Sequence, residues 1–432
     1  MVTKVTRKKV HHVVSRPGRV LGDPDVEIPV AEELATTPGA VENSIDVDFY
    51  SRKYPLESQA VTHTADRNWV WTVYHPEEEE AHHEHERMVK PLVDAARASG
   101  DIEPTVEPVS GKDITAEIKL KARELGFGEV GITRYDRRYT FAYKKKWARF
   151  EHAVCVAYEQ DYERTQAIPG SFAEFTHFGT YRAMSQKALL LADYIRSLGY
   201  HAQIHSPNDN SAAYIPMFVS AGLGQLGANG QLLSPHFGSR ARLLVITTDA
   251  IVTYDQPIDY GIHKFCEQCQ VCINRCPGRA LMRDKVWWRG VQKHKLVYEN
   301  CRPVMARYSG CGICMKVCPV QKYGMPAVMK HYVETNGQIL GKGTHELEGY
   351  NIEGKGYYGP GELPHFDRDF FQIPHGKSED VLFEKFKEQL KKNAVPDGPA
   401  GDLMLRDFKK KIHRIVTTPV EDAMAGKTPE EA

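Results

Sequence analysis

CEQCQVCINRCP (residues 266–277) and CGICMKVCP (residues 311–319) are the two stretches that decide how this chain of 432 residues folds. The first spaces four cysteines as C-x2-C-x2-C-x3-C before a proline, and the second places three cysteines before another proline. Cys301 lies a short way upstream of the second stretch. Eight of the nine cysteines therefore fall within residues 266–318, and only Cys155 stands apart. Thiols concentrated in this way predict a metal centre.

The spacing of the first stretch is the signature of bacterial ferredoxins with two [4Fe–4S] clusters, in which the fourth cysteine ligates the other cluster. Three thiolates two residues apart can cover three corners of one iron–sulfur cube, so the fourth ligand must come from elsewhere in the chain. We therefore expect two clusters, each held by cysteines of both stretches. The expected ligands of one cluster are Cys266, Cys269, Cys272 and Cys318, and those of the other are Cys276, Cys301, Cys311 and Cys314.

Zinc and disulfides are the alternative explanations for these cysteines. Structural zinc sites prefer two separated C-x2–4-C pairs, and the longer run here exceeds what one tetrahedral ion needs. Disulfides require an oxidising compartment, but the N-terminus shows neither the apolar segment of a secretory signal nor a twin-arginine pair. Cys155 lies inside a predicted strand over residues 153–158, where a cysteine acts as a small buried hydrophobe and not as a ligand.

The composition limits the classes of partner. Lysine plus arginine number 56 and aspartate plus glutamate number 56, so no global basic field attracts a nucleic acid or an anionic membrane. The 41% hydrophobic and 26% charged residues are typical of a globular protein. No apolar stretch approaches the ~20 residues that span a bilayer. We therefore expect a cytoplasmic protein that binds neither nucleic acid nor membranes.

The residue pattern divides the chain into four parts. They are an N-terminal extension over residues 1–110, an α/β core over 111–260, the cysteine module over 261–325, and a C-terminal cap and tail over 326–432. In the core, apolar periodicity predicts helices over 114–125 and 180–198 and strands over 128–133, 153–158 and, as a pair, 240–252. A last helix is predicted over 378–392. His82, His83 and His85 are expected on a solvated helix rather than in a metal site.

A glycine-rich loop over residues 221–230 (AGLGQLGANG) contains a literal G-x-G-x-x-G. A dinucleotide site requires a strand before this motif, whereas the preceding residues 213–220 read as a helix. The loop instead offers bare backbone that can lie against a large planar ligand.

The order of four motifs carries a family resemblance. LGY at 198–200, AGLGQLG at 221–227 and GSRARL at 238–243 precede the cysteine module, and this order resembles the corrinoid-dependent reductive dehalogenases. Their cousins, the epoxyqueuosine reductases, share the core. The resemblance covers about residues 110–330. It implies an α+β fold: a nitroreductase-like cobalamin-binding core with an inserted or appended bacterial ferredoxin-like module carrying two [4Fe–4S] clusters.

The resemblance also implies roles for individual residues. The family's proton-donating tyrosine matches Tyr181, and the basic residue that assists it matches Arg240, with Arg242 as the main alternative. Tyr181 is expected in the first turn of its helix, where the helix dipole favours phenolate; a plain core tyrosine is the other interpretation. The expected cobalamin-binding residues are Asn208, Gly222, Leu223, Gly224, Gly227 and Ser239. The corrinoid is expected base-off, since the chain has no D-x-H-x-x-G motif.

The implied function is a cobalamin-dependent reductive dehalogenase that cleaves a carbon–halogen bond, with electrons passing through the two clusters. Aromatic residues between 350 and 371 suggest an aryl halide, although a packed wrap is the plainer explanation. The electron donor is expected to be a separate ferredoxin, flavodoxin or flavin reductase. The alternatives are an epoxyqueuosine reductase, whose catalytic aspartate would fall at Asn208 with Asp209 beside it, and an electron-transfer iron–sulfur protein.

Overall fold

The computed structural model describes residues 75, 78–140, 144–209, 211–288, 291–367, 370–371 and 404, together with the backbone of β1 (Val41–Glu42). The helix predicted over residues 378–392 and most of the predicted N-terminal extension lie outside these residues. In the described part of the chain, no helix is long and apolar enough to cross a membrane.

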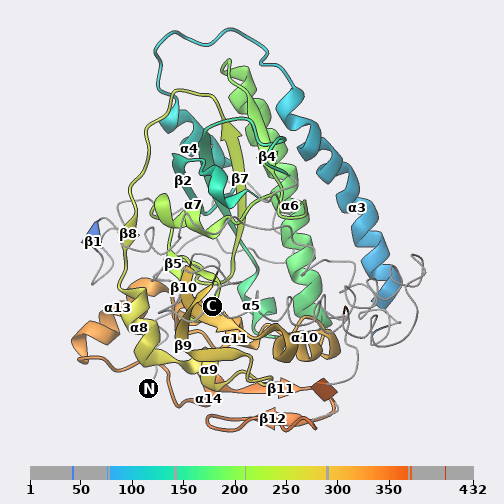
Figure 1. Cartoon of the computed structure of the whole chain (residues 1–432), viewed down its shortest axis with the longest axis vertical. Helices are drawn as coiled ribbons and strands as arrows, with labels where there is room; N and C mark the ends of the chain where they lie inside the picture. Colours follow the sequence, from blue (N-terminus) through green and yellow to red (C-terminus); the bar gives the residue numbers. More distant parts are fainter. Residues whose placement is uncertain are drawn as a thin grey trace.

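The core is built on a four-stranded antiparallel sheet with the order β2-β3-β7-β4 (Figure 1). Its strands are β2 (Glu129–Arg134), β3 (His152–Glu159), β7 (Ala241–Thr248) and β4 (Ala202–His205). Strands predicted over 128–133 and 153–158 are thus confirmed. The pair predicted over 240–252 is wrong, because one continuous strand, β7, occupies that stretch.

Both faces of the sheet are covered, and nearly all residues of its strands are buried. Val154 and Val156 of β3 point into a core shared with α4 (Thr115–Glu124) and α6 (Ser171–Ser197). Cys155 points to the opposite face, into a core shared with α7 (Ile215–Ser220) and the cysteine module. Successive strand residues alternate between faces, and Cys155 is a fully buried residue of the sheet, as expected.

Helix α6 is longer than predicted and changes the setting of Tyr181. It begins at Ser171, nine residues before the predicted start, because phenylalanine, threonine and Gly179 are weak helix formers that hid its first turns. Tyr181 consequently lies more than two turns from the N-terminus. The expectation that the helix dipole acts on Tyr181 is wrong, since that effect fades within the first turn.

Part of the predicted N-terminal extension belongs to the core. Helix α3 (Glu79–Ala98) packs along α6 and β4 (Figure 1). His85 stacks on Phe178 with 4.4 Å between ring centroids, and His82 meets the same ring edge-on at 5.1 Å. The prediction of a solvated helix therefore holds for His83, which is exposed. It does not hold for His82 and His85, which are half-buried against α6.

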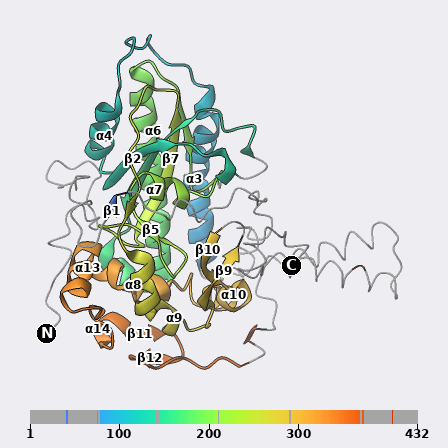
Figure 2. The ribbon, with the colours of Figure 1, turned by 60° about the vertical axis from the view of Figure 1, so that its left-hand side comes forward.

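The cysteine module lies below the sheet (Figures 1 and 2). Its helices are α8 (Ile262–Cys269), α9 (Val271–Asn274), α10 (Tyr298–Arg307), α11 (Ile313–Lys316), α12 (Pro319–Tyr323) and α13 (Met325–Glu334). A hairpin of β9 (Leu281–Trp288) and β10 (Val291–Leu296) separates the two cysteine stretches.

The segment after α13 wraps the cysteine module. It contains α14 (His345–Glu348) and a hairpin of β11 (Tyr350–Ile352) and β12 (Gly356–Tyr358). Tyr350 lies 4.7 Å below the guanidinium of the buried Arg275, and its hydroxyl donates to the Arg275 carbonyl. Phe366, Phe370 and Phe371 pack on each other and on the same core. These contacts favour the packed wrap over a substrate-binding cap.

Candidate iron–sulfur and catalytic site

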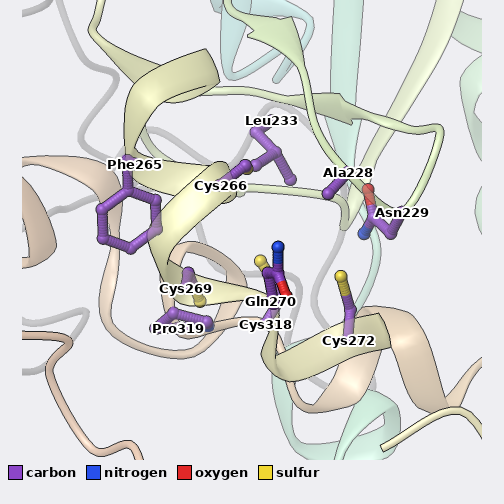
Figure 3. A pocket seen from close by; sticks show the side chains of 10 residues that line it. All are labelled: Ala228, Asn229, Leu233, Phe265, Cys266, Cys269, Gln270, Cys272, Cys318 and Pro319. Carbon is purple, nitrogen blue, oxygen red and sulfur yellow. The ribbon is translucent and has the colours of Figure 1, made fainter. Parts of the chain in front are cut away.

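Four thiols meet at one cavity between the cysteine module and the glycine-rich loop (Figure 3). Cys266 and Cys269 come from α8, Cys272 from α9, and Cys318 from the residue that precedes α12. Residues 228–229 of the glycine-rich loop line the cavity on the loop side. The structure therefore brings together the four residues that spacing alone assigned to one cluster.

The other four thiols form a second group. Burial raises the pKa of the Cys301 thiol to about 12, and its electrostatic neighbour is Cys276. The Cys311 thiol, whose pKa burial also raises, interacts with both of these residues, and Cys314 interacts with all three. Cys276 thus leaves its own stretch to join the second group, and Cys318 crosses in the opposite direction.

Burial raises the pKa of these thiols, and hydrogen bonds from backbone N–H groups lower the pKa of several of them. The pKa of Cys269 rises to about 12 and that of Cys318 to about 11. The amide of Ala280 donates to the Cys276 sulfur at 3.3 Å, and the amides of Gln321 and Val320 donate to Cys318. Thiols in such surroundings ionise when a cationic metal centre binds them, and the amides then stabilise the resulting thiolates.

Tyr181 lies at the edge of the α6 core, beside Arg242 of β7. The Arg242 guanidinium carbon is 5.7 Å from the centroid of the Tyr181 ring, and both side chains are half-buried. Arg242 Nε donates to Gln160 Oε1 at 2.8 Å, and its Nη2 approaches the sulfur of Met315 at 3.9 Å. Since Met315 lies between Cys314 and Cys318, Arg242 connects Tyr181 to the cysteine module.

Arg240 does not occupy the place predicted for it. Its side chain is almost completely buried: Nη2 pairs with Glu159 Oε1 at 2.7 Å and Nη1 donates to the carbonyl of Gln321 at 2.7 Å. Its guanidinium also lies over the ring of Tyr162, at 4.8 Å. These contacts join the core to α12, so the alternative, Arg242, is the arginine that the structure places next to Tyr181.

Sequence reasoning missed an acid–histidine pair on α6. His177 Nδ1 lies 3.1 Å from Glu174 Oε2, and the His177 ring meets Tyr181 edge-on at 5.2 Å between centroids. Glu174 also faces the cysteine module, because a Cβ on Gly310 would be 2.2 Å from Glu174 Oε2. The spacing of three and four residues along a helix was the available signal, but the helix was predicted to begin only at residue 180.

The predicted cobalamin contacts in the glycine-rich loop have a packing explanation. A Cβ on Gly222 would be 2.6 Å from the carbonyl oxygen of Gln256, and one on Gly224 would be 2.5 Å from that of Leu233. Gly227 is closed in by the Leu233 side chain in the same way, and Leu223 is buried in the core. The chain's own atoms occupy the space beside these glycines, and their contact with a planar ligand stays a prediction. The helix α7 before the loop agrees with the argument against a dinucleotide site.

Three polar side chains near this region have no hydrogen-bond partner within the described part of the chain. They are the Ser239 hydroxyl, the Asn208 side-chain nitrogen and both polar atoms of the Gln321 amide. Gln321 is only 1% exposed, and a Cβ on Gly238 would be 2.5 Å from its Cα, so Gln321 lies directly below the Ser239 segment. Buried polar atoms are nearly always paired in native proteins, so Ser239 and Gln321 could accept a polar ligand as a partner.

Asp209 is held by two cations. Arg97 Nη2 lies 2.6 Å from its Oδ1, and Lys144 pairs with its Oδ2. This buried carboxylate therefore anchors α3 and the segment around Lys144 to the loop, while Asn208 beside it is half-buried.

A thiol-rich module packed against an α+β core, with a tyrosine–arginine pair between them, is an arrangement that fits an oxidoreductase. No protein-family model matches the chain. The tetrachloroethene reductive dehalogenase of Sulfurospirillum multivorans is 32% identical over 182 residues, which are 40% of this chain and 36% of that protein. The enzyme of the same name from Dehalobacter restrictus is 33% identical over 222 residues, 41% of this chain and 40% of that protein.

Further matches are an epoxyqueuosine reductase, from the second family that the sequence resembles, and two solved structures. The epoxyqueuosine reductase of Lactococcus garvieae is 29% identical over 255 residues, 49% of this chain and 70% of that protein. The catabolic reductive dehalogenase NpRdhA in complex with 3-bromo-4-hydroxybenzoic acid matches with a TM-score of 0.56 and 23% identity, over 68% of this chain and 46% of that one. A reductive dehalogenase solved for B12-dependent dehalogenation matches with a TM-score of 0.55 and 22% identity, over 78% and 55%.

These matches confirm the resemblance: the chain is related to the reductive dehalogenases and to the epoxyqueuosine reductases. Both groups are oxidoreductases, as expected for this chain. The chain spans about two fifths of the length of the tetrachloroethene reductive dehalogenases that it matches. The structural likeness shows the mixed α/β fold alone.

Proposed function

We propose that the chain is a cobalamin- and [4Fe–4S]-dependent reductive dehalogenase. The observation that carries the proposal is the contact of Arg242 with both Tyr181 and Met315, because it joins a proton donor to the two groups of thiols. The overall reaction would consume two electrons and one proton, and would convert a carbon–halogen bond into a carbon–hydrogen bond and a halide ion.

The thiols fit two [4Fe–4S] clusters better than zinc. Each group has four buried or half-buried cysteines, and those of the first group line one cavity. Among the described residues, no three or more His, Cys, Asp or Glu side chains converge closely enough to hold a single metal ion. Tetrahedral zinc requires such convergence, with sulfur at about 2.3 Å from the ion, whereas a cluster keeps its ligands apart. These observations support the proposal of one bacterial ferredoxin-like module with two clusters.

We propose that the core holds a corrinoid in a nitroreductase-like arrangement. A corrinoid carries peripheral amides that need hydrogen-bond partners, and the buried Ser239 hydroxyl, the buried Gln321 amide and the side-chain nitrogen of the half-buried Asn208 have none within the described part of the chain. These three residues would hold its rim. When bound base-off, the corrinoid would supply a reducible cobalt centre for cleavage of the carbon–halogen bond.

The chain's own residues would then handle the proton. Tyr181 Oη donates it to the carbon that loses the halogen, and the guanidinium of Arg242 stabilises the negative charge left on the phenolate. Gln160 holds that guanidinium in place through its amide oxygen. The His177 ring, oriented by Glu174, lies against Tyr181 and restricts the position of its side chain.

The proposal extends to the substrate, the electron donor and the location of the protein. An aryl halide is supported by NpRdhA, which was solved with a brominated hydroxybenzoic acid; the aromatic wrap around residues 350–371 gives no added support, since it packs on the cysteine module. A separate ferredoxin, flavodoxin or flavin reductase would deliver the electrons in the cytoplasm.

An epoxyqueuosine reductase is the second candidate, and Asp209 argues against it. A catalytic carboxylate has to reach its substrate, but Asp209 is buried and paired with Arg97 and Lys144. The neighbouring position is Asn208, whose amide cannot act as a general acid at neutral pH.

The test is anaerobic reconstitution of the full chain with iron, sulfide and cobalamin. We expect a corrinoid absorbance band, cobalt and iron in the protein, and halide release from a bromohydroxybenzoate with reduced methyl viologen as electron source. Tyr181→Phe should bind cobalamin normally and lose about 100-fold or more in turnover. Absence of the corrinoid band, or turnover of epoxyqueuosine in a transfer RNA stem-loop by the same preparation, would overturn the proposal.

A further inference from the structure

The charge of the cysteine module differs from that of the whole chain. Although the chain is neutral overall, residues 261–296 carry eight lysines and arginines and only two acidic residues. This segment comprises α8, α9 and the β9–β10 hairpin, which are the elements around the first group of thiols. A local field of this strength attracts an acidic partner even when the net charge is zero.

Two exposed cations contact the turn at the end of α8, and a third lies on the preceding helical turn. Arg283 of β9 donates to the side chain of Gln270, and Lys342 Nζ donates to the Cys269 carbonyl at 2.9 Å. Lys264 lies one helical turn before Gln268 on α8 and thus on the same side of that helix. We call Lys264, Arg283 and Lys342 the basic face.

The charges of the basic face are not cancelled by the acids nearest to them. The exposed Glu267 of α8 is already paired with Lys285, at 2.5 Å. Asp284 follows Arg283 on β9 and therefore points to the other side of the hairpin. Arg283 itself bonds to two neutral amides, those of Gln270 and Asn274.

The turn beneath the basic face is also the cover of the first thiol group. Cys269 and Gln270 both line the cavity where Cys266, Cys272 and Cys318 meet (Figure 3). Gln270 adopts a left-handed conformation, with φ of 50°, which ends α8 and lets α9 begin immediately. A partner seated on the basic face is therefore separated from the first thiol group only by this turn.

From these contacts we infer that the basic face is the docking surface for a small acidic electron-carrier protein of the ferredoxin or flavodoxin type. This rests on the proposed function, which requires an electron source. In each encounter the carrier loses one electron and the first cluster gains one, and no bond is made or broken. A protein is favoured over RNA because the face covers the thiols, whereas Tyr181, where a nucleoside would have to react, lies on α6 in the core.

The experiment uses the reconstituted full chain and a charge-reversal variant, Lys264→Glu/Arg283→Glu. The probe is a reduced acidic 2×[4Fe–4S] ferredoxin, and the readout is the rate of cluster bleaching in a stopped-flow instrument. We expect the variant to be reduced about tenfold or more slowly at low ionic strength, and to lose most of the salt dependence of the parent. The matched control is Arg87→Glu/Lys90→Glu on α3, where both side chains are exposed; it should stay within about twofold of the parent.

Reduced methyl viologen separates docking from folding and from chemistry. It should reduce the clusters of parent and variant at rates within about twofold, because a small reductant needs no docking surface. Equal ferredoxin rates in parent and variant, or an equal loss in the α3 control, would overturn the docking proposal. So would binding of a transfer RNA stem-loop that the Lys264→Glu/Arg283→Glu variant loses while ferredoxin still reduces it normally. If methyl viologen reduces the clusters but no halide is released, the dehalogenase proposal fails while docking stands.

Discussion

Arg240 and Arg242 lie two residues apart in the sequence, but their contacts in the structure differ. Arg240 is the last residue of the turn before β7 and Arg242 is the second residue of that strand; both belong to the GSRARL motif, so the sequence could not separate them. Burial does: Arg240 is 1% exposed and paired with Glu159, whereas Arg242 is half-buried and lies over Tyr181. One arginine stabilises the interface of core and module, and the other is available to assist a reaction.

Replacing each arginine with glutamine should therefore affect a different property: catalysis for Arg242 and stability for Arg240. Arg242→Gln should fold with normal stability and lose about 10- to 100-fold in kcat with little change in KM, because a charge that acts on the developing phenolate is removed. Arg240→Gln should lose about 3 kcal/mol or more in the free energy of unfolding, because Glu159 is left buried without its partner. Denaturant unfolding and steady-state kinetics distinguish the two. A catalytic loss in stably folded Arg240→Gln, with Arg242→Gln fully active, would reverse the assignment.

Strand β4 is tied to β7 by a buried histidine. His205 Nε2 lies 3.2 Å from the hydroxyl of Thr247, and its Nδ1 lies 2.8 Å from that of Ser211 in the loop that follows β4. Burial lowers the pKa of His205 to about 3, with Lys144 contributing in the same direction. The imidazole is therefore neutral in the folded protein at neutral pH.

This histidine should make the fold acid-sensitive. The folded pKa lies below the ordinary value of about 6.5, so the unfolded chain binds more protons between these values and the stabilisation is lost as pH falls from about 6.5 towards 3. The loss should be on the order of a few kcal/mol in the free energy of unfolding. His205→Gln should be less stable at pH 8 but show a flatter dependence between pH 7 and 5, measured by urea unfolding. An unchanged slope would show that another group is responsible.

At the scale of the whole molecule, the two cysteine stretches are interleaved. Cys276 belongs to the first stretch but to the second group of thiols, and Cys318 belongs to the second stretch but to the first group. The β9–β10 hairpin and α10 separate the two stretches in the sequence. In the fold, Cys318 of the second stretch lines the same cavity as the cysteines of the first. The module therefore acts as one unit and cannot be divided between its cysteine stretches.

Single alanine variants should expose this interleaving. Cys318→Ala and Cys269→Ala should perturb one and the same cluster signal in electron paramagnetic resonance, and Cys276→Ala and Cys311→Ala the other, because each pair shares a thiol group. Iron content should fall by up to about half in each case. Cys155→Ala serves as the control and should keep all its iron, since Cys155 lies in the sheet. If Cys318→Ala changed the same signal as Cys311→Ala, the proposed ligand sets would be wrong.

The sequence by itself determined the features that depend on short spacing and strong periodicity. The close spacing of the cysteines predicted that they fall into two groups, and the apolar run around Cys155 predicted a buried strand; both depend on local geometry. The start of α6 was missed because its first turns contain weak helix formers. Two strands were predicted over residues 240–252 where the structure has one, because a continuous apolar run leaves the local signal ambiguous.

The tertiary structure alone decided what depends on contacts between distant residues. It paired Arg240 with Glu159 and placed Arg242 over Tyr181, it brought His177 and Glu174 beside that tyrosine, and it filled the space next to the glycines with the chain's own atoms. It also placed Arg283 and Lys342 on the turn that lines the first thiol group, in a chain whose net charge is zero. Net charge and motif order are properties of the sequence alone. Electrostatic and packing energies depend on distances between residues, which only the folded chain defines.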